Sequence, residues 1–482
     1  RGIGAETMQE FEALGYWFLP ENPSREIPGT LRFSPSRGLA LSLSGTFAPG
    51  DTLAEAFQSS SAQKHAIIHG VTNGSPYGKM FTLVDCFRSG MTLHMPGFAT
   101  EEIHANSAYA GDCLLREGDL RFDKSRVNFS DLANWIRLTG IRADLPKGAN
   151  EPYTFRVEYA KVGGVHATFA GCPLTIGLGH RLSFEDSKRS VVLRENVSIL
   201  IAELGQLTIE EIERKYLSPL QDFFTLAADL PNARCEFVVF GQRLSRDGVI
   251  GPSAIHVLGE PIYVREEGET CRDEDKMLFT YDDVSGFFQS LLDRWLTFRE
   301  RFASFCQLYF SAQYSRGAYV EERFLSAVRA LTLLFRETMP APPGIRHAID
   351  EMREELARIS GERRFGWVDD VVPMEAELAF PWSLSEVLTK YEGLLSGLIT
   401  PDIEHFVNAI AATRRYVSCP DQSSRPNVLH GADLHWATEK LNVLIKICLL
   451  DWLEFPQDLI ARLLNRNASF RHLRSVPCPR TG

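Results

Sequence analysis

The first two hundred residues alternate between apolar and polar positions in the manner of β-strands. In the segment GTLRFSPSRGLALSLSG, Leu39, Leu41 and Leu43 alternate with small or polar residues after a Ser-Pro-Ser-Arg-Gly turn. Aromatic or apolar residues also occupy every second position from Tyr153 to Tyr159. Turn-forming segments such as TNGSPYG separate these runs. The pattern predicts a β-rich region, built as a sandwich or as a barrel-like sheet.

Further along the chain, the apolar residues recur with a helical period. A helical insertion is expected at about 207–230, followed by another strand in CEFVVFG. Beyond about Asp282 nearly every segment is helical, and four apolar residues share one helix face: Phe324, Val328, Leu331 and Phe335. The segment DLHWATEKLNVLIKICLLDWLEF is apolar almost all round, which is typical of a central bundle helix. We therefore expect an α+β protein with a β-rich region at 1–290 and an all-α bundle at 291–482.

Composition and charge narrow the range of functions. The 482 residues are 44% hydrophobic and 23% charged, as in an ordinary globular protein with two or three domains. The formal net charge of −11 argues against a protein that coats nucleic acid through bulk electrostatics. From Pro401 onward, however, ten Lys and Arg residues exceed eight Asp and Glu residues. A local, specific RNA contact is therefore compatible with the carboxy-terminal part of the chain.

The sequence indicates neither a metal site nor a membrane-spanning segment. Nine cysteines are scattered without a C-x-x-C pair, which argues against a zinc ribbon and favours reduced thiols in the cytoplasm. His65 and His69 have the spacing of a helical zinc pair, but they lack the adjacent Glu and lie in strand-like surroundings. No apolar run reaches the roughly 18 residues needed to span a bilayer. We expect no cofactor and no membrane contact.

The segment TRRYVSCPDQSSRPNVLH contains the main candidates for chemistry. Arg414 precedes Cys419 by five positions, and Arg425 precedes His430 by the same interval. An Arg-x4-His pair can form a metal-free ribonuclease site, because a guanidinium binds phosphate while an imidazole moves protons near neutral pH. From position alone, arginines in the last turn of a helix more often complement its macrodipole. Cys419 alone is typical of a packed thiol, and His430 of a surface histidine.

The limits of the helix that carries Arg414 are also predicted. Thr400 is a candidate N-cap and Pro401 a candidate first helical residue. Pro420 disfavours helical geometry at Cys419, so the helix should end near Ser418.

Several longer segments resemble a known family. GYWFLPENPSREIPGTLRFSPSRGLALSLSGTF, FTLVDC and LRFDKSRVNFSDLANWIRLTGI are similar to the amino-terminal part of the ApeA family of bacterial anti-phage defence proteins. YVEERFLSAVRALTLLF and LHGADLHWATEKLNVLIKICLLDWLEF resemble helices of the HEPN (higher eukaryotes and prokaryotes nucleotide-binding) domain with which those proteins end. The segments follow one another in the family's order along nearly the whole chain.

This resemblance implies a metal-independent endoribonuclease that acts in abortive infection. Host tRNA or mRNA is its expected substrate, and the amino-terminal region is expected to sense a phage-derived trigger or to regulate the bundle. In such domains two protomers share a cleft, which implies a homodimer or a higher even oligomer. The motif arginine holds the scissile phosphate, and the motif histidine assists attack by the 2′-hydroxyl. Arg414 matches that arginine, and Arg415 and Arg425 are candidate RNA contacts.

The chain departs from the family's pattern at three polar positions. Cys419 stands where the motif histidine is expected, and Thr332 and Phe335 stand where an acid and a histidine often occur upstream. Two explanations follow. Either His430 supplies the missing imidazole, or the protein has lost cleavage and serves as a non-enzymatic RNA-binding sensor or scaffold.

Overall fold

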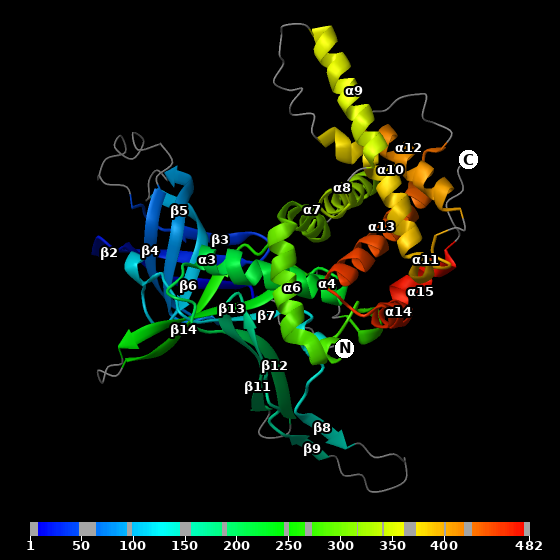
Figure 1. Ribbon diagram of the computed structural model, residues 1–482. Helices are drawn as coiled ribbons and strands as arrows, with labels where there is room; N and C mark the ends of the chain where they lie inside the picture. Colours follow the sequence, from blue (N-terminus) through cyan, green and yellow to red (C-terminus); the bar gives the residue numbers. More distant parts are fainter. Residues whose placement is uncertain are drawn as a thin grey trace. The chain divides into compact units, whose positions relative to one another are not determined.

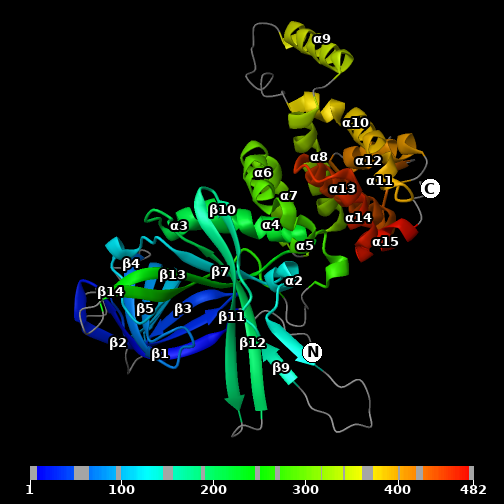
Figure 2. The same ribbon diagram turned by 60° about the horizontal axis from the view of Figure 1, so that its bottom comes forward.

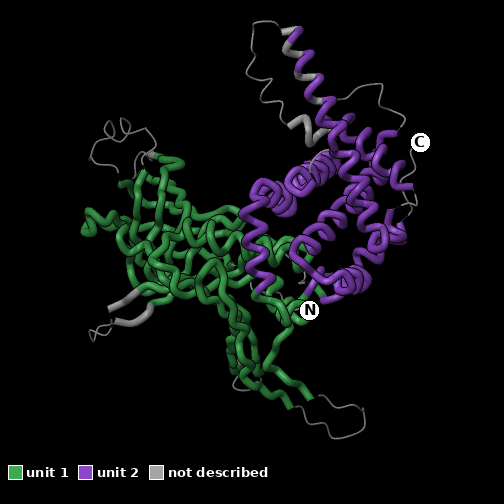
Figure 3. Tube along the Cα trace, viewed as in Figure 1, with its two compact units in different colours: residues 1–273, 280–289 green, residues 274–279, 290–482 purple. Residues whose placement is uncertain are grey.

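The chain divides into two compact units. The computed structural model describes residues 8–47, 64–93, 99–144, 156–185, 190–244, 250–265, 272–315, 317–339, 342–360, 373–399, 402–418 and 427–476. One unit comprises residues 1–273 and 280–289, and the other comprises residues 274–279 and 290–482 (Figure 3). The first is rich in strands and the second is helical, which confirms the predicted α+β class (Figure 1).

A closed antiparallel barrel forms the first part of the β-rich unit. Its six strands pair in the ring order β1-β2-β3-β6-β5-β4, so the barrel alternative is the correct one. These strands are β1 (Phe11–Leu19), β2 (Asn22–Ser34), β3 (Gly38–Leu43), β4 (Lys64–Asn73), β5 (Met80–Leu93) and β6 (Ala99–Gly111). Leu39, Leu41 and Leu43 are buried in the barrel core, as their alternation predicts. Trp17 lies wholly inside the barrel against Gly70, where a Cβ atom would come within 2.3 Å of the indole ring.

The interior of the barrel also holds an ion pair. Arg88 on β5 donates from Nε to the Glu101 carboxylate on β6 at 2.6 Å, and the side chain of Glu101 is 0% exposed. The other carboxylate oxygen accepts the backbone N–H of Phe47 at 2.9 Å. A buried carboxylate is tolerable only with such partners, because burial removes its hydration. This pair is a point on which the barrel's stability depends.

A second, open sheet continues from β6. Strand β6 pairs with β5 along one edge, and along its other edge first with β3 and then with β14. The order from there is β14-β13-β7-β12-β11-β10 (Figure 2). The strands are β7 (Ser125–Phe129), β10 (Val165–Phe169), β11 (Cys172–Glu185), β12 (Ser190–Ile201), β13 (Arg234–Leu244) and β14 (Ile250–Gly259). Strands β8 (Ile141–Asp144) and β9 (Arg156–Tyr159) form a separate two-stranded antiparallel sheet. Tyr153 and Phe155 of the predicted alternation lie outside the described residues.

Short helices accompany this sheet. Within the segment expected as a helical insertion lie α3 (Ile209–Ile212), the wide turn Glu213–Leu217 and α4 (Ser218–Ala228). Thr208 and Glu211 form a capping box at the start of α3, which satisfies backbone donors that the helix leaves free. Helix α2 (Leu132–Ile136) buries Trp135 against Phe223 and Phe224 of α4. The remaining short elements of the unit are the turns Glu117–Asp119 and Ser285–Phe287 and the helix α5 (Tyr281–Val284).

The helical unit is built around α8 and α13. Helix α8 contacts α7, α10, α12 and α13. The helices are α6 (Phe288–Arg301), α7 (Ala303–Tyr314), α8 (Val320–Thr338), α9 (Pro343–Ser360), α10 (Pro373–Lys390), α11 (Glu392–Leu395), α12 (Ile403–Ser418), α13 (Gly431–Trp452), α14 (Gln457–Arg466) and α15 (Ala468–Ser475), preceded by the turn Glu274–Lys276. The predicted stripe of Phe324, Val328, Leu331 and Phe335 is buried, and α13 buries residues around most of its circumference. Both observations confirm the bundle.

Candidate functional site

Helix α12 carries the predicted motif arginine near its end. The helix begins at Ile403, not at Pro401, and the Asp402 carboxylate caps it by accepting the backbone N–H of His405 at 2.9 Å. The capping residue was therefore misassigned, because Asp is as good an N-cap as Thr and the sequence offers both. Thr400 and Pro401 lie outside the described residues. The helix is described as far as Ser418, and the residues that follow it, Cys419 included, also lie outside the described part of the chain.

Arg414 is half-buried and lies on an aromatic ring. Its guanidinium carbon is 4.8 Å from the centre of the Phe380 ring on α10. Burial, followed by the nearby charge of Arg329 on α8, lowers the pKa of Arg414 to about 10. A guanidinium with that pKa is still charged at neutral pH. Two contributions make this charge less favourable, namely its partial burial away from water and the positive charge of Arg329 nearby. Such a position attracts anions, because a phosphate would offset both unfavourable contributions.

Two positions for which the family resemblance implies an acid and a histidine hold Thr332 and Phe335. Thr332 is buried, and its hydroxyl donates to the backbone carbonyl of Val328 at 2.8 Å. Phe335 is buried, and its ring centre lies 6.1 Å from that of Phe380, the ring that carries Arg414. The Phe380 ring beneath Arg414 is thus packed against a second aromatic ring, that of Phe335. The sequence identified these two substitutions but did not single out Phe380 or Arg329.

His430 lies beside α12, at the start of α13. Leu429 donates its backbone N–H to the Thr413 hydroxyl oxygen at 2.9 Å, and Thr413 donates to the Ala409 carbonyl at 2.7 Å. This connection folds the segment before α13 back onto α12. The exposed His430 ring then meets the Tyr416 ring edge-on, with the ring centres 5.5 Å apart.

Arg414 and His430 nevertheless point in different directions. An α-helix turns by about 100° per residue, so residues two apart on it project roughly 160° away from each other. His430 contacts Tyr416, whereas Arg414 turns towards Phe380. The structure brings the two side chains to the same end of α12 but to different faces of that helix.

The other residues considered in the sequence lie on the surface, within strand β4, or outside the described residues. Arg415 is exposed on α12. Cys419 and Arg425 lie outside the described residues. His65 and His69 belong to strand β4, where the His69 ring hydrogen-bonds the Leu115 carbonyl at 2.8 Å. Within the described ranges, no group of three or more His, Cys, Asp or Glu side chains could hold a metal ion.

Comparison with protein families settles the kinship of both parts of the chain. Residues 12–295, more than half of the chain, match the family model for ApeA N-terminal domain 1. The chain belongs to the ApeA family. In keeping with this, residues 325–459 match the Apea-like HEPN domain, a range that includes all of α12 and α13. No curated protein and no solved structure matches this ApeA-family chain.

Arg414 therefore lies inside the HEPN domain, as do Thr332, Phe335, Phe380 and His430. Among the described residues, no helix is long and apolar enough to cross a bilayer.

Proposed function

We propose that this ApeA-family protein is an endoribonuclease of anti-phage defence that cleaves cytoplasmic RNA, such as tRNA or mRNA, without a metal ion. The observation that carries the proposal is the half-buried, charged Arg414 beside a second cation, Arg329, within a HEPN domain. That pair supplies what a scissile phosphodiester needs, which is a fixed positive charge where negative charge develops. The amino-terminal unit would regulate this activity in response to a phage-derived trigger.

The proposed reaction uses the ribose of the substrate as nucleophile. The 2′-oxygen attacks phosphorus, the bond from phosphorus to the 5′-oxygen breaks, and the products carry a 2′,3′-cyclic phosphate and a 5′-hydroxyl. Arg414 binds the non-bridging phosphate oxygens throughout. An imidazole takes the proton from the 2′-hydroxyl and returns a proton to the leaving 5′-oxygen. His430 is the candidate for that imidazole, in place of the histidine expected at position 419.

Purified protein incubated with total RNA in EDTA tests this proposal. We expect cleavage products that end in 2′,3′-cyclic phosphate, because Arg414 and His430 need no metal to act. The products should be detected by adaptor ligation with an RNA ligase that accepts cyclic phosphates, and His430→Ala should remove them. If RNA binds without being cut, under these conditions and with divalent cations restored, the enzymatic proposal is wrong.

A second candidate function is RNA binding without cleavage, as a sensor or scaffold in defence. This candidate is favoured by Thr332 and Phe335, which occupy the two positions for which the resemblance implies an acid and a histidine. The Thr332 hydroxyl is bonded to a backbone carbonyl, and the Phe335 ring packs against Phe380. Phe335 can support the Phe380 ring beneath Arg414, but neither residue can replace an acid or a histidine in proton transfer. Binding without products in the experiment above would support this candidate.

We further propose that the reacting groups come from two copies of the chain. Since Arg414 points to one face of α12 and His430, at the start of α13, lies against a different face of that helix, a phosphate on Arg414 is better placed to meet the imidazole of a neighbouring protomer. Mixing equal amounts of Arg414→Ala protein and His430→Ala protein should then restore about a quarter of the wild-type cleavage. After subunit exchange about half of the dimers are mixed, and each mixed dimer regains both groups in one of its two shared clefts. Each variant alone should be inactive.

Two outcomes contradict this arrangement. One is a monomer by light scattering at the assay concentration. The other is a mixture that stays as inactive as its components after subunit exchange, which would place both groups within one chain.

A further inference from the structure

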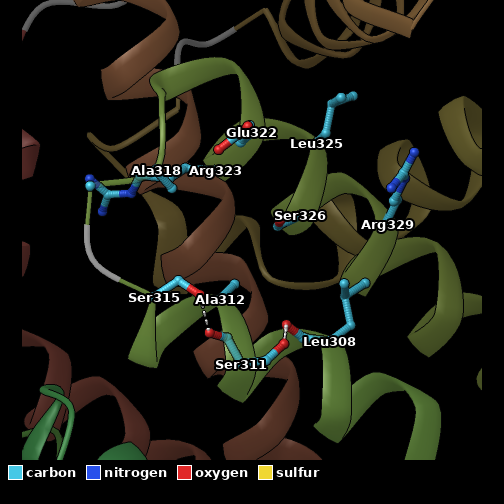
Figure 4. Close-up of a pocket in the computed structure, with 11 residues that line it drawn as sticks. Leu308, Ser311, Ala312, Ser315, Ala318, Glu322, Arg323, Leu325, Ser326 and Arg329 are labelled. Atoms are coloured by element: carbon cyan, nitrogen blue, oxygen red, sulfur yellow. Dashed lines mark hydrogen bonds between the residues drawn. The ribbon is translucent and has the colours of Figure 1, made fainter. Parts of the chain in front are cut away.

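The helical unit contains a pocket between α7 and α8 (Figure 4). Its volume is about 490 Å³, within the range of cavities that hold small ligands. Leu308, Ala312 and Leu325 supply apolar walls, and Gly317 and Ala318 line it where the chain passes from α7 to α8. We call this cavity the α7–α8 pocket.

The pocket offers hydroxyl groups from both helices. Ser311 and Ser315 donate to α7 carbonyls, at 3.1 Å to Leu308 and 2.9 Å to Ser311, so their oxygens remain available as acceptors. Ser326 on α8 lines the pocket and makes no hydrogen bond among the described residues, so its hydroxyl can both donate and accept. Hydroxyls of this kind suit the edge of a base or the hydroxyls of a ribose.

Charged residues on α8 surround Ser326. Figure 4 shows Ser326 between Arg323 and Arg329. Arg323 pairs with Glu439 of α13 at 3.3 Å, whereas Arg329 is exposed and has no ion-pair partner in the described part of the chain. Glu322 also lines the pocket and would repel a chain of several phosphates. One base and ribose with a single phosphate match this distribution of charge.

Arg329 connects the pocket to Arg414. It lines the pocket, and its positive charge acts on the Arg414 guanidinium. Helices α8 and α12 are in contact, so both arginines belong to one packed region of the unit. Two like charges that act on each other can be bridged by an anion, and Arg329 belongs both to this pair and to the pocket lining.

We propose that the α7–α8 pocket holds one nucleotide of a single-stranded RNA whose adjoining phosphate is bound by Arg329 and Arg414. This inference rests on the proposed function in taking RNA as the ligand, but it does not require that the RNA be cut. It assigns a binding role to Ser326 and Arg329, which lie outside the Arg-x4-His motif. The nucleotide in the pocket fixes the register of the strand relative to Arg414.

Binding of a short single-stranded RNA with 2′-fluoro sugars tests the proposal, since that strand cannot be cleaved by 2′-hydroxyl attack. Fluorescence anisotropy on the full-length protein should show at least a tenfold increase in Kd for Ser326→Leu, which fills the pocket, and for Arg329→Gln. The matched control is Arg462→Gln, which removes an exposed arginine from α14, outside the pocket. Its Kd should stay within twofold of the wild type.

The outcomes separate this proposal from the catalytic one. If Ser326→Leu fails to fold, the exposed Arg329→Gln variant alone decides. Wild-type affinity in a folded Arg329→Gln protein overturns the pocket assignment, whether or not RNA is cleaved in EDTA. Weakened binding in a protein that never cleaves RNA supports the pocket and removes only the catalytic proposal. Competition by AMP, CMP, GMP or UMP at concentrations equal to the RNA would instead identify a free-nucleotide site and overturn the RNA assignment.

Discussion

Replacing Arg414 with alanine should reduce RNA cleavage by at least ~100-fold, the loss typical of removing a donor that stabilises transition-state charge. Toxicity of the expressed protein in a bacterial host should disappear with it. The half-buried guanidinium, which lies over the Phe380 ring, has the phosphate-binding role in the proposed reaction. The measurement is the initial rate of cyclic-phosphate formation, together with colony counts after induction.

Three companion variants separate chemistry from folding. Arg414→Met keeps the apolar stem on the Phe380 ring and should be as inactive as Arg414→Ala, with a melting temperature close to the wild type. Arg414→Lys keeps the charge but loses the planar fork, so most of the activity should still be lost. Arg415→Ala removes the neighbouring exposed cation and should weaken RNA binding only a few-fold. Full toxicity in a folded Arg414→Met protein would remove this residue from the mechanism.

The largest expected effect on stability lies in the barrel, at Arg88. Replacing Arg88 with methionine leaves the fully buried Glu101 carboxylate with the Phe47 N–H but without its cation. Breaking one side of a buried ion pair costs about 3–5 kcal/mol, because the remaining charge cannot recover its hydration. Urea unfolding of the full chain, followed by circular dichroism in the β-sheet region, should show this loss in the free energy of unfolding.

An exposed ion pair of the same barrel provides the control. Arg32 and Glu12 are 3.3 Å apart, but their side chains are 58% and 59% exposed. Arg32→Met should therefore change the free energy of unfolding by less than about 1 kcal/mol. A double variant, Arg88→Met with Glu101→Leu, should recover most of the stability, since it removes the stranded charge as well. Equal effects of the two single arginine variants would show that Glu101 gains no protection from Arg88.

Local patterns in the sequence predicted much of the fold, because each depends on neighbouring residues alone. The alternation around Leu39 and Leu43 identifies β3, and the helical stripe from Phe324 to Phe335 identifies α8. Closure of the barrel could not be predicted in this way. It depends on β6 pairing with both β3 and β5, and no local signal specifies which distant strands meet.

In the candidate site, too, some residues could be found from the sequence, whereas others depend on how distant segments pack. Resemblance to the family pointed to Arg414, and helical periodicity placed it in the last turns of the helix that the structure shows as α12. Phe380 was not found, since it lies 34 positions upstream in an apolar helix whose pattern indicates only burial. Arg329 resembles any exposed arginine on an amphipathic helix until the packing of α8 against α12 places it near Arg414. The turn of the chain that sets His430 against Tyr416 depends on a tertiary hydrogen bond to Thr413.

Strand β6 is shared by the barrel and the open sheet, and this has a practical consequence for dissecting the protein. A fragment that contains only the barrel must include β6, because the barrel closes through the pairing of β6 with β5. Without β14, however, the backbone of β6 at residues 107–110 would lose its hydrogen-bonding partner strand. Bare strand edges recruit other chains and promote aggregation. The amino-terminal unit is therefore best expressed whole, because the barrel cannot be separated from the open sheet without exposing a strand edge.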